Sequence, residues 1–76
     1  MDVKVYHTTN CAFCKVEMQW LDSKGIQYRH YNIDDNPAAK YTLEKLTGLL
    51  SVPVTIIDGN VIKGFDRKAL TEALGL

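Results

Sequence analysis

The hydrophobic pattern of this chain switches repeatedly between the alternation of a β-strand and the spacing of an amphipathic helix. Strands are predicted over residues 3–7, 26–33, 54–57 and 61–63, and helices over residues 12–24, 37–47 and 67–74. The order is therefore β-α-β-α-β-β-α. A strand–helix–strand unit implies a parallel pair with a right-handed crossover, and Asp58-Gly59 predicts an antiparallel hairpin near the C-terminus. Together they predict a four-stranded mixed sheet with helices on both faces.

A length of 76 residues is enough for one small domain, which we expect to span residues 1–76. The 9 basic residues balance the 9 acidic ones, which argues against nucleic acid or an anionic membrane as the main partner. No apolar run approaches the ~18 residues of a membrane span, and the start of the chain lacks a signal-peptide pattern. We therefore expect a soluble, cytoplasmic protein.

The only two cysteines, Cys11 and Cys14, lie where the first strand gives way to the first helix. A disulfide closing so short a loop stabilises the fold by roughly 2 kcal/mol in the chain-entropy model, so this pair would be a weak structural bond. A zinc site needs four ligands, and one chain offers these two cysteines with His7 and His30 away from ligand spacing. An iron–sulfur or zinc site shared between two copies of the chain stays open as an alternative.

The placement of these cysteines favours thiol–disulfide chemistry. Cys11 lies at a helix N-terminus, where unpaired amides and the positive end of the helix dipole stabilise a thiolate. Cys14 follows one turn later and points inward, on the helix face of Met18 and Leu21. We therefore expect Cys11 to attack a disulfide and Cys14 to resolve the mixed disulfide that forms.

Two further segments carry signals of function. Pro53 directly precedes a buried strand, where a residue without an N–H is tolerated, and an X-Pro bond is the one place where a cis peptide costs little. Gly64-Phe65-Asp66 opens the last helix, where Asp66 is a suitable cap. A helix N-terminus of this kind also attracts anions.

The combination of Cys-Ala-Phe-Cys at a helix start, Val52-Pro53 before the third strand, a hairpin and Gly64-Phe65-Asp66 resembles the glutaredoxins and glutaredoxin-like, NrdH-type redoxins of the thioredoxin fold. The match covers nearly the whole chain. It implies a cis peptide bond at Pro53, with the proline packed beside the cysteines. It also implies that the Val52 backbone pairs with a bound peptide or with glutathione.

The resemblance assigns two more features to ligand binding. The amides of Gly64, Phe65 and Asp66 would meet a carboxylate of the ligand, and Phe13 stands where the family carries a tyrosine beside the thiols. The implied activity is that of a small, monomeric dithiol oxidoreductase that reduces protein disulfides or glutathione mixed disulfides. No cofactor would be bound, glutathione would serve as a co-substrate, and the electrons would come from NADPH through a separate reductase.

Three departures from the family pattern leave the electron donor open. Thr8 stands where glutaredoxins carry Lys or Arg, and Ala12-Phe13 replaces Pro-Tyr between the cysteines. Gly64-Phe65 is closer to the NrdH-type redoxins, which take electrons from thioredoxin reductase and pass them to ribonucleotide reductase, yet Ile62-Lys63 replaces their Trp-Ser. The alternative of another class is a dimeric carrier of iron–sulfur or metal on the same cysteines, although Cys-Ala-Phe-Cys departs from the Cys-Gly-Phe-Ser of cluster carriers.

Overall fold

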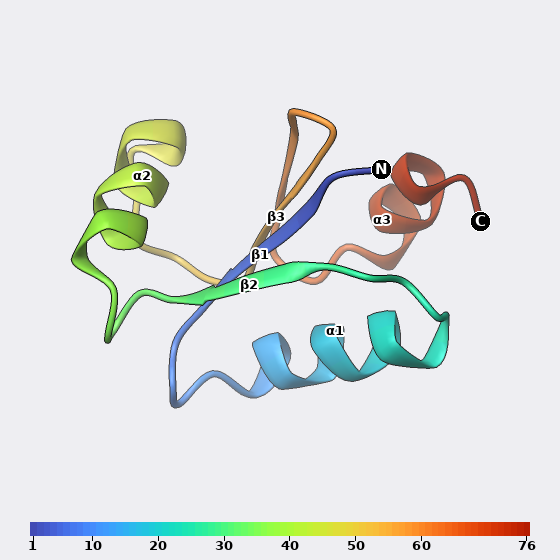
Figure 1. Cartoon of the computed structure of the whole chain (residues 1–76), viewed down its shortest axis with the longest axis horizontal. Helices are drawn as coiled ribbons and strands as arrows, with labels where there is room; N and C mark the ends of the chain where they lie inside the picture. The colour runs from blue at the N-terminus through green and yellow to red at the C-terminus, as the bar shows by residue number, and fades with distance from the viewer.

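The computed structural model describes residues 1–76 and consists of a four-stranded sheet flanked by three helices (Figure 1). The elements are β1 (Val3–His7), α1 (Ala12–Ser23), β2 (Arg29–Asn32), α2 (Pro37–Thr47), β3 (Val54–Ile57), β4 (Asn60–Lys63) and α3 (Arg67–Leu74). Their order confirms the predicted succession of strands and helices. None of the three helices has the length and apolar character that crossing a membrane requires.

The strands lie in the order β2-β1-β3-β4. β1 pairs in parallel with β2, and the pairs β1–β3 and β3–β4 are antiparallel, which confirms the mixed sheet. The turn between β3 and β4 places Asp58 at φ 47° and Gly59 at φ 88°. Two successive residues at positive φ are what a tight hairpin turn compatible with strand twist requires, and Asp-Gly supplies them at low cost.

Helices cover both faces of the sheet, and each face has its own apolar core. One core joins α1 and α3 to the strands through Val3, Val5, Leu21, Ile57, Leu70 and Leu74. The second core joins α2 to the opposite face through Tyr6, Ile33, Ala39, Leu43 and Val54. Figure 1 shows α2 separated by the strands from the other two helices.

Each helix begins at a side chain that accepts a hydrogen bond from the backbone N–H three residues later. The capping residues are Cys11 for α1, Asn36 for α2 and Asp66 for α3. A side-chain cap of this kind satisfies one of the backbone donors that a helix start leaves unpaired. The caps fix where each helix starts, and for α1 the cap is itself one of the two cysteines.

The second strand is shorter than the sequence predicts. Residues 26–33 alternate like a strand, but only Arg29–Asn32 pair with β1. Pairing begins at the register partners Lys4 and Arg29, near the start of β1. Ile26 and Tyr28 instead lie in the loop before β2, where their side chains pack against the core beneath α1 and α3.

Replacing Leu21 by alanine tests the core between α1 and the sheet. Leu21 is fully buried, and we expect Leu21→Ala to lower the free energy of unfolding by about 2–5 kcal/mol, because it removes buried methylene groups and leaves a cavity. The matched control is Val16→Ala on the same helix, where the side chain is 45% exposed and the change should stay within about 0.5 kcal/mol. Urea unfolding of both variants gives the comparison, and equal losses would contradict the assignment of the core.

Candidate functional site

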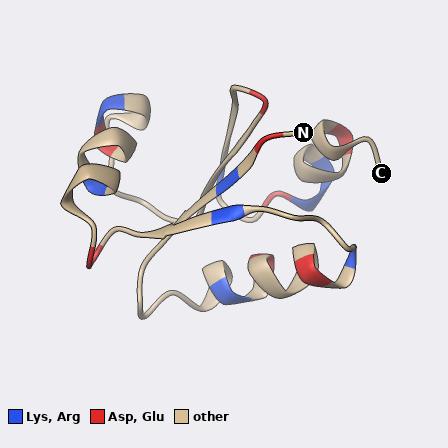
Figure 2. Ribbon diagram, viewed as in Figure 1, with Lys and Arg blue, Asp and Glu red and all other residues tan.

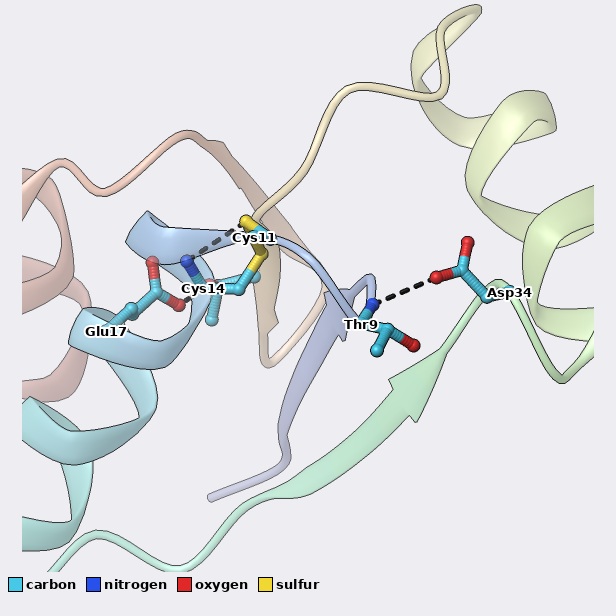
Figure 3. The surroundings of a disulfide bond; sticks show 6 residues. Thr9, Cys11, Cys14, Glu17 and Asp34 are labelled. Atoms are coloured by element: carbon cyan, nitrogen blue, oxygen red, sulfur yellow. Dashed lines mark hydrogen bonds between the residues drawn. A yellow bond between two sulfur atoms is a disulfide. The ribbon is translucent and has the colours of Figure 1, made fainter.

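Cys11 and Cys14 form a disulfide at the N-terminal end of α1, with their Cα atoms 5.2 Å apart (Figure 3). The two side chains differ in accessibility, because Cys11 is partly exposed while Cys14 is completely buried. The backbone N–H of Cys14 donates to Cys11 Sγ at 3.1 Å. An incoming molecule can therefore reach only the first cysteine, whose sulfur also lies at a helix start that stabilises negative charge.

Hydrogen bonds hold the loop that presents Cys11. The backbone N–H of Thr9 donates to Asp34 Oδ2 at 2.9 Å (Figure 3). Asn32 Nδ2 donates to Thr9 Oγ1 at 3.0 Å. Asn32 Oδ1 in turn accepts from the backbone N–H of Asp34 at 2.9 Å. The end of β2 thus braces the segment between β1 and α1.

The chain segment that leads into the disulfide contains no charged side chain. No Lys, Arg, Asp or Glu occurs between Val5 and Cys14, and Figure 2 shows this stretch free of coloured residues. Lys15 is the first charged residue of α1, and the first turn of the helix contains no acidic side chain. Nothing in that turn opposes a thiolate at Cys11.

Three of the predicted ligand-binding residues come together at one pocket. The Val52–Pro53 peptide bond is cis, and Pro53 is buried immediately before β3. The backbone N–H of Gly64 donates to the Pro53 carbonyl at 2.8 Å. Val52, Pro53 and Gly64 line a pocket of about 90 Å³ together with residues of the α2–β3 connection and the end of β4.

The other predicted ligand-binding residues lie elsewhere. The ring of Phe65 packs edge-on against Trp20 of α1, with centroids 6.0 Å apart. The Asp66 carboxylate caps its own helix by accepting from the Ala69 N–H at 3.0 Å, as predicted for a cap. Phe13 projects from α1 with 66% of its side chain exposed. The Phe65 ring and the Asp66 carboxylate are therefore both engaged within the protein.

Glu17 is a buried residue of the site that the sequence reasoning missed. Its side chain is fully buried on α1, and Thr55 Oγ1 of β3 donates to Glu17 Oε2. The other oxygen, Oε1, is buried without a partner. Burial raises the pKa of this carboxyl, and the hydrogen bond from Thr55 acts in the opposite, weaker sense. The signal was present in the sequence, because Cys14, Glu17 and Leu21 share one helical face.

The two histidines lie beside each other on neighbouring strands. His7 Nε2 and His30 Nδ1 are 3.0 Å apart, and burial together with the neighbouring His30 lowers the pKa of His7. No group of three or more His, Cys, Asp or Glu side chains is arranged to hold a metal ion.

Comparison with known proteins gives consistent matches. The family model for glutaredoxin matches residues 3–62. A glutaredoxin-like 8.6 kDa protein encoded in the rubredoxin operon of Clostridium pasteurianum is 32% identical over 95% of this chain and 96% of its own. Glutaredoxin 3 of Escherichia coli K12 is 31% identical over 97% of this chain and 89% of its own.

Solved structures show the same fold. A mutant of the thioredoxin-like protein BC3987 superposes with a TM-score of 0.93 at 26% identity, covering 97% of this chain and 95% of that one. A buckwheat glutaredoxin in complex with glutathione has a TM-score of 0.75 at 26% identity, covering 96% and 69%. NrdH-redoxin from Escherichia coli, with a TM-score of 0.84 over 95% and 93%, is 22% identical and supports the fold alone.

A change at Glu17 should alter how stability depends on pH. Burial raises the pKa of this carboxyl above its ordinary value of 4.5, so the folded protein keeps a proton that the unfolded chain releases as pH rises. Stability of the wild type should therefore fall as pH rises through this range. Glu17→Gln cannot lose stability in this way, because its amide does not titrate. Each 1 kcal/mol of unfolding free energy shifts the Tm of a small domain by about 4–8 °C.

We expect the Tm of Glu17→Gln, relative to the wild type, to rise by several degrees between weakly acidic and neutral pH. Calorimetry of the oxidised proteins measures it. The matched control is Glu44→Gln, an exposed glutamate of α2, whose difference from the wild type should stay flat. If the difference in Tm between Glu17→Gln and the wild type also does not change with pH, the raised pKa of Glu17 is contradicted.

Proposed function

As this chain belongs to the glutaredoxin family and is a thiol–disulfide oxidoreductase, we propose that Cys11 is the attacking thiolate and Cys14 the resolving thiol. The observation that carries this assignment is the contrast in accessibility between a partly exposed Cys11 at the start of α1 and a fully buried Cys14. A substrate disulfide reaches only the first sulfur. The family matches favour this function over a dimeric carrier of metal or iron–sulfur.

The reaction proceeds in two exchanges. The Cys11 thiolate attacks one sulfur of a substrate disulfide, the other substrate sulfur leaves as a thiolate, and a mixed disulfide forms on Cys11. Cys14 then attacks Cys11 Sγ, the second substrate thiolate leaves, and the Cys11–Cys14 disulfide remains. The substrate gains two electrons, and the protein ends in the oxidised state that the structure represents.

The backbone of Val52 is the proposed docking edge for a peptide or for glutathione. Val52 is half-buried, and neither its N–H nor its C=O takes part in any backbone hydrogen bond. Both groups are therefore free to pair with the backbone of an extended ligand. The adjoining pocket at Pro53 and Gly64 would hold the ligand beside this edge, and the exposed ring of Phe13 would flank it.

The start of α3 supplies the proposed anion site. The Asp66 side chain already accepts from the Ala69 N–H, so a ligand carboxylate would meet the earlier amides, from Phe65 to Lys68, which make no backbone hydrogen bond. The positive end of the helix favours an anion there. Phe65 contributes its amide, while its ring stays packed on Trp20.

Glutathione is the proposed electron donor, and NADPH supplies the electrons through glutathione reductase. The family match and the buckwheat glutaredoxin–glutathione complex support this choice. Thioredoxin reductase is the other donor to test, with protein disulfides such as that of ribonucleotide reductase as substrates. We expect the protein to act as a monomer in the cytoplasm, where thiols are kept reduced.

Replacing each cysteine in turn tests the proposed roles. Cys11→Ser should abolish turnover of a glutathione mixed disulfide, because it removes the attacking sulfur. Cys14→Ser should stop at the mixed disulfide with a protein substrate, and mass spectrometry should detect that adduct on Cys11. Full turnover by Cys11→Ser would refute the assignment.

The donor can be identified by following NADPH consumption by the oxidised protein in two systems. Glutathione with glutathione reductase should support turnover, and thioredoxin reductase should not. The reverse result would contradict the donor proposed here while leaving the roles of the cysteines untouched.

A further inference from the structure

We propose that the carboxylate of Glu17 accepts the proton of the Cys14 thiol when Cys14 attacks the mixed disulfide at Cys11, and returns it when the Cys11–Cys14 disulfide is reduced. The inference rests on the proposed roles of the two cysteines and adds a third group to the reaction. Glu17 is the only buried acidic side chain of the protein.

Helix geometry brings the two groups together. Cys14 and Glu17 are three residues apart on α1, a spacing at which side chains are neighbours on a helix surface. Both side chains are 0% exposed, so both point from α1 into the interior and not to solvent. Figure 3 shows the Glu17 carboxyl group directed toward Cys14.

The carboxyl group has one oxygen held and one oxygen free. Thr55 Oγ1, itself completely buried in β3, donates to Glu17 Oε2 and fixes the orientation of the group. Oε1 has no hydrogen-bond partner. An unpaired carboxylate oxygen in the interior is costly, and binding a proton there relieves that cost.

The surroundings make Glu17 a good proton acceptor. The one ion pair of the protein joins Lys4 to Asp2 at the surface, so no cation neutralises the buried carboxylate. Burial raises the pKa of Glu17, and the hydrogen bond from the Thr55 hydroxyl lowers it by less. No charged neighbour contributes to the shift. Cys14 is the other buried titratable group on this helix face, and its thiol is shielded from water that could take its proton.

The proposed step balances in atoms and electrons. The S–H bond of Cys14 breaks, and its proton forms an O–H bond on Glu17. The electron pair left on Cys14 sulfur forms the bond to Cys11 Sγ, and the bond from Cys11 to the substrate sulfur breaks, with its electron pair leaving on the substrate thiolate. During reduction of the protein disulfide, Glu17 gives the proton back to the Cys14 thiolate.

A purely structural role for Glu17 predicts a different behaviour. In that case Glu17 serves only to accept the hydrogen bond from Thr55 and to fill space beneath α1. Gln has nearly the same shape and keeps an oxygen acceptor for Thr55, but it cannot take a proton. Glu17→Gln therefore separates the two roles.

The experiment follows one turnover of reduced protein with limiting DTNB, an aromatic disulfide whose thionitrobenzoate product absorbs visible light. The first release of product reports attack by Cys11, and the second reports resolution by Cys14. In Glu17→Gln the first phase should be unchanged and the second should slow by about 100-fold, the lower end of what a positioned proton acceptor contributes. Glu17→Asp, which keeps a carboxylate, should recover part of the second phase.

The pH dependence provides a readout that packing alone would not move. In the wild type the second phase should accelerate as pH rises through the raised pKa of Glu17, because only the carboxylate accepts the proton. Glu17→Gln should lack this acceleration. The matched control is Glu72→Gln on the exposed face of α3, which should leave both phases and both pH profiles unchanged.

The outcomes separate this inference from the function on which it rests. A second phase in Glu17→Gln with the wild-type rate and pH profile overturns the role of Glu17 and leaves the cysteine roles in place. Equal slowing of both phases also overturns it, because it indicates a general structural effect. A normal first phase in Cys11→Ser overturns the proposed function itself.

Discussion

The start of α1 is the constraint on which the rest of the site depends. Cys11 has two roles there, because its sulfur caps the helix by accepting from the Cys14 N–H and also forms the disulfide. The segment before it is tied to the end of β2 by Thr9, Asn32 and Asp34. The parallel pairing of β1 and β2 brings that segment within reach, so the sheet topology fixes the position of the reactive sulfur.

The interior behind the disulfide shows a conflict between stability and reactivity. Leu21 and Leu70 form the apolar core under α1, as expected for a small domain, yet Glu17 takes a core position on the same helix face. A leucine there would avoid the cost of burying a carboxyl group. Natural proteins commonly carry destabilising groups at reactive sites, and the proposed proton transfer gives this one a chemical use.

The fold followed from the sequence because its local signals agree with one another. Asn36-Pro37 starts α2, Gly48 ends it and Asp58-Gly59 turns the hairpin, each through a local backbone preference that residue type alone determines. The prediction for the second strand was wrong at its N-terminal end. Ile26 and Tyr28 alternate because they contact the core, and they do not pair with a strand.

The site was less accessible to sequence reasoning than the fold. The cysteines stand out by chemistry and spacing, but the partner of Glu17 is Thr55, 38 positions away, and no local pattern shows that contact. Likewise the ring of Phe65 turns toward Trp20 of α1, a long-range packing choice that the family resemblance did not specify. Contacts between distant elements therefore determine which of the expected residues face a ligand.

One sulfur of the pair meets the substrate, and the other is held behind it. Alkylation of the reduced protein with a small amount of iodoacetamide, followed by peptide mapping, measures this difference in accessibility. We expect the label to enter Cys11 first and to leave Cys14 unmodified while the protein is folded. Equal labelling of the two cysteines, or faster labelling of Cys14, would contradict it.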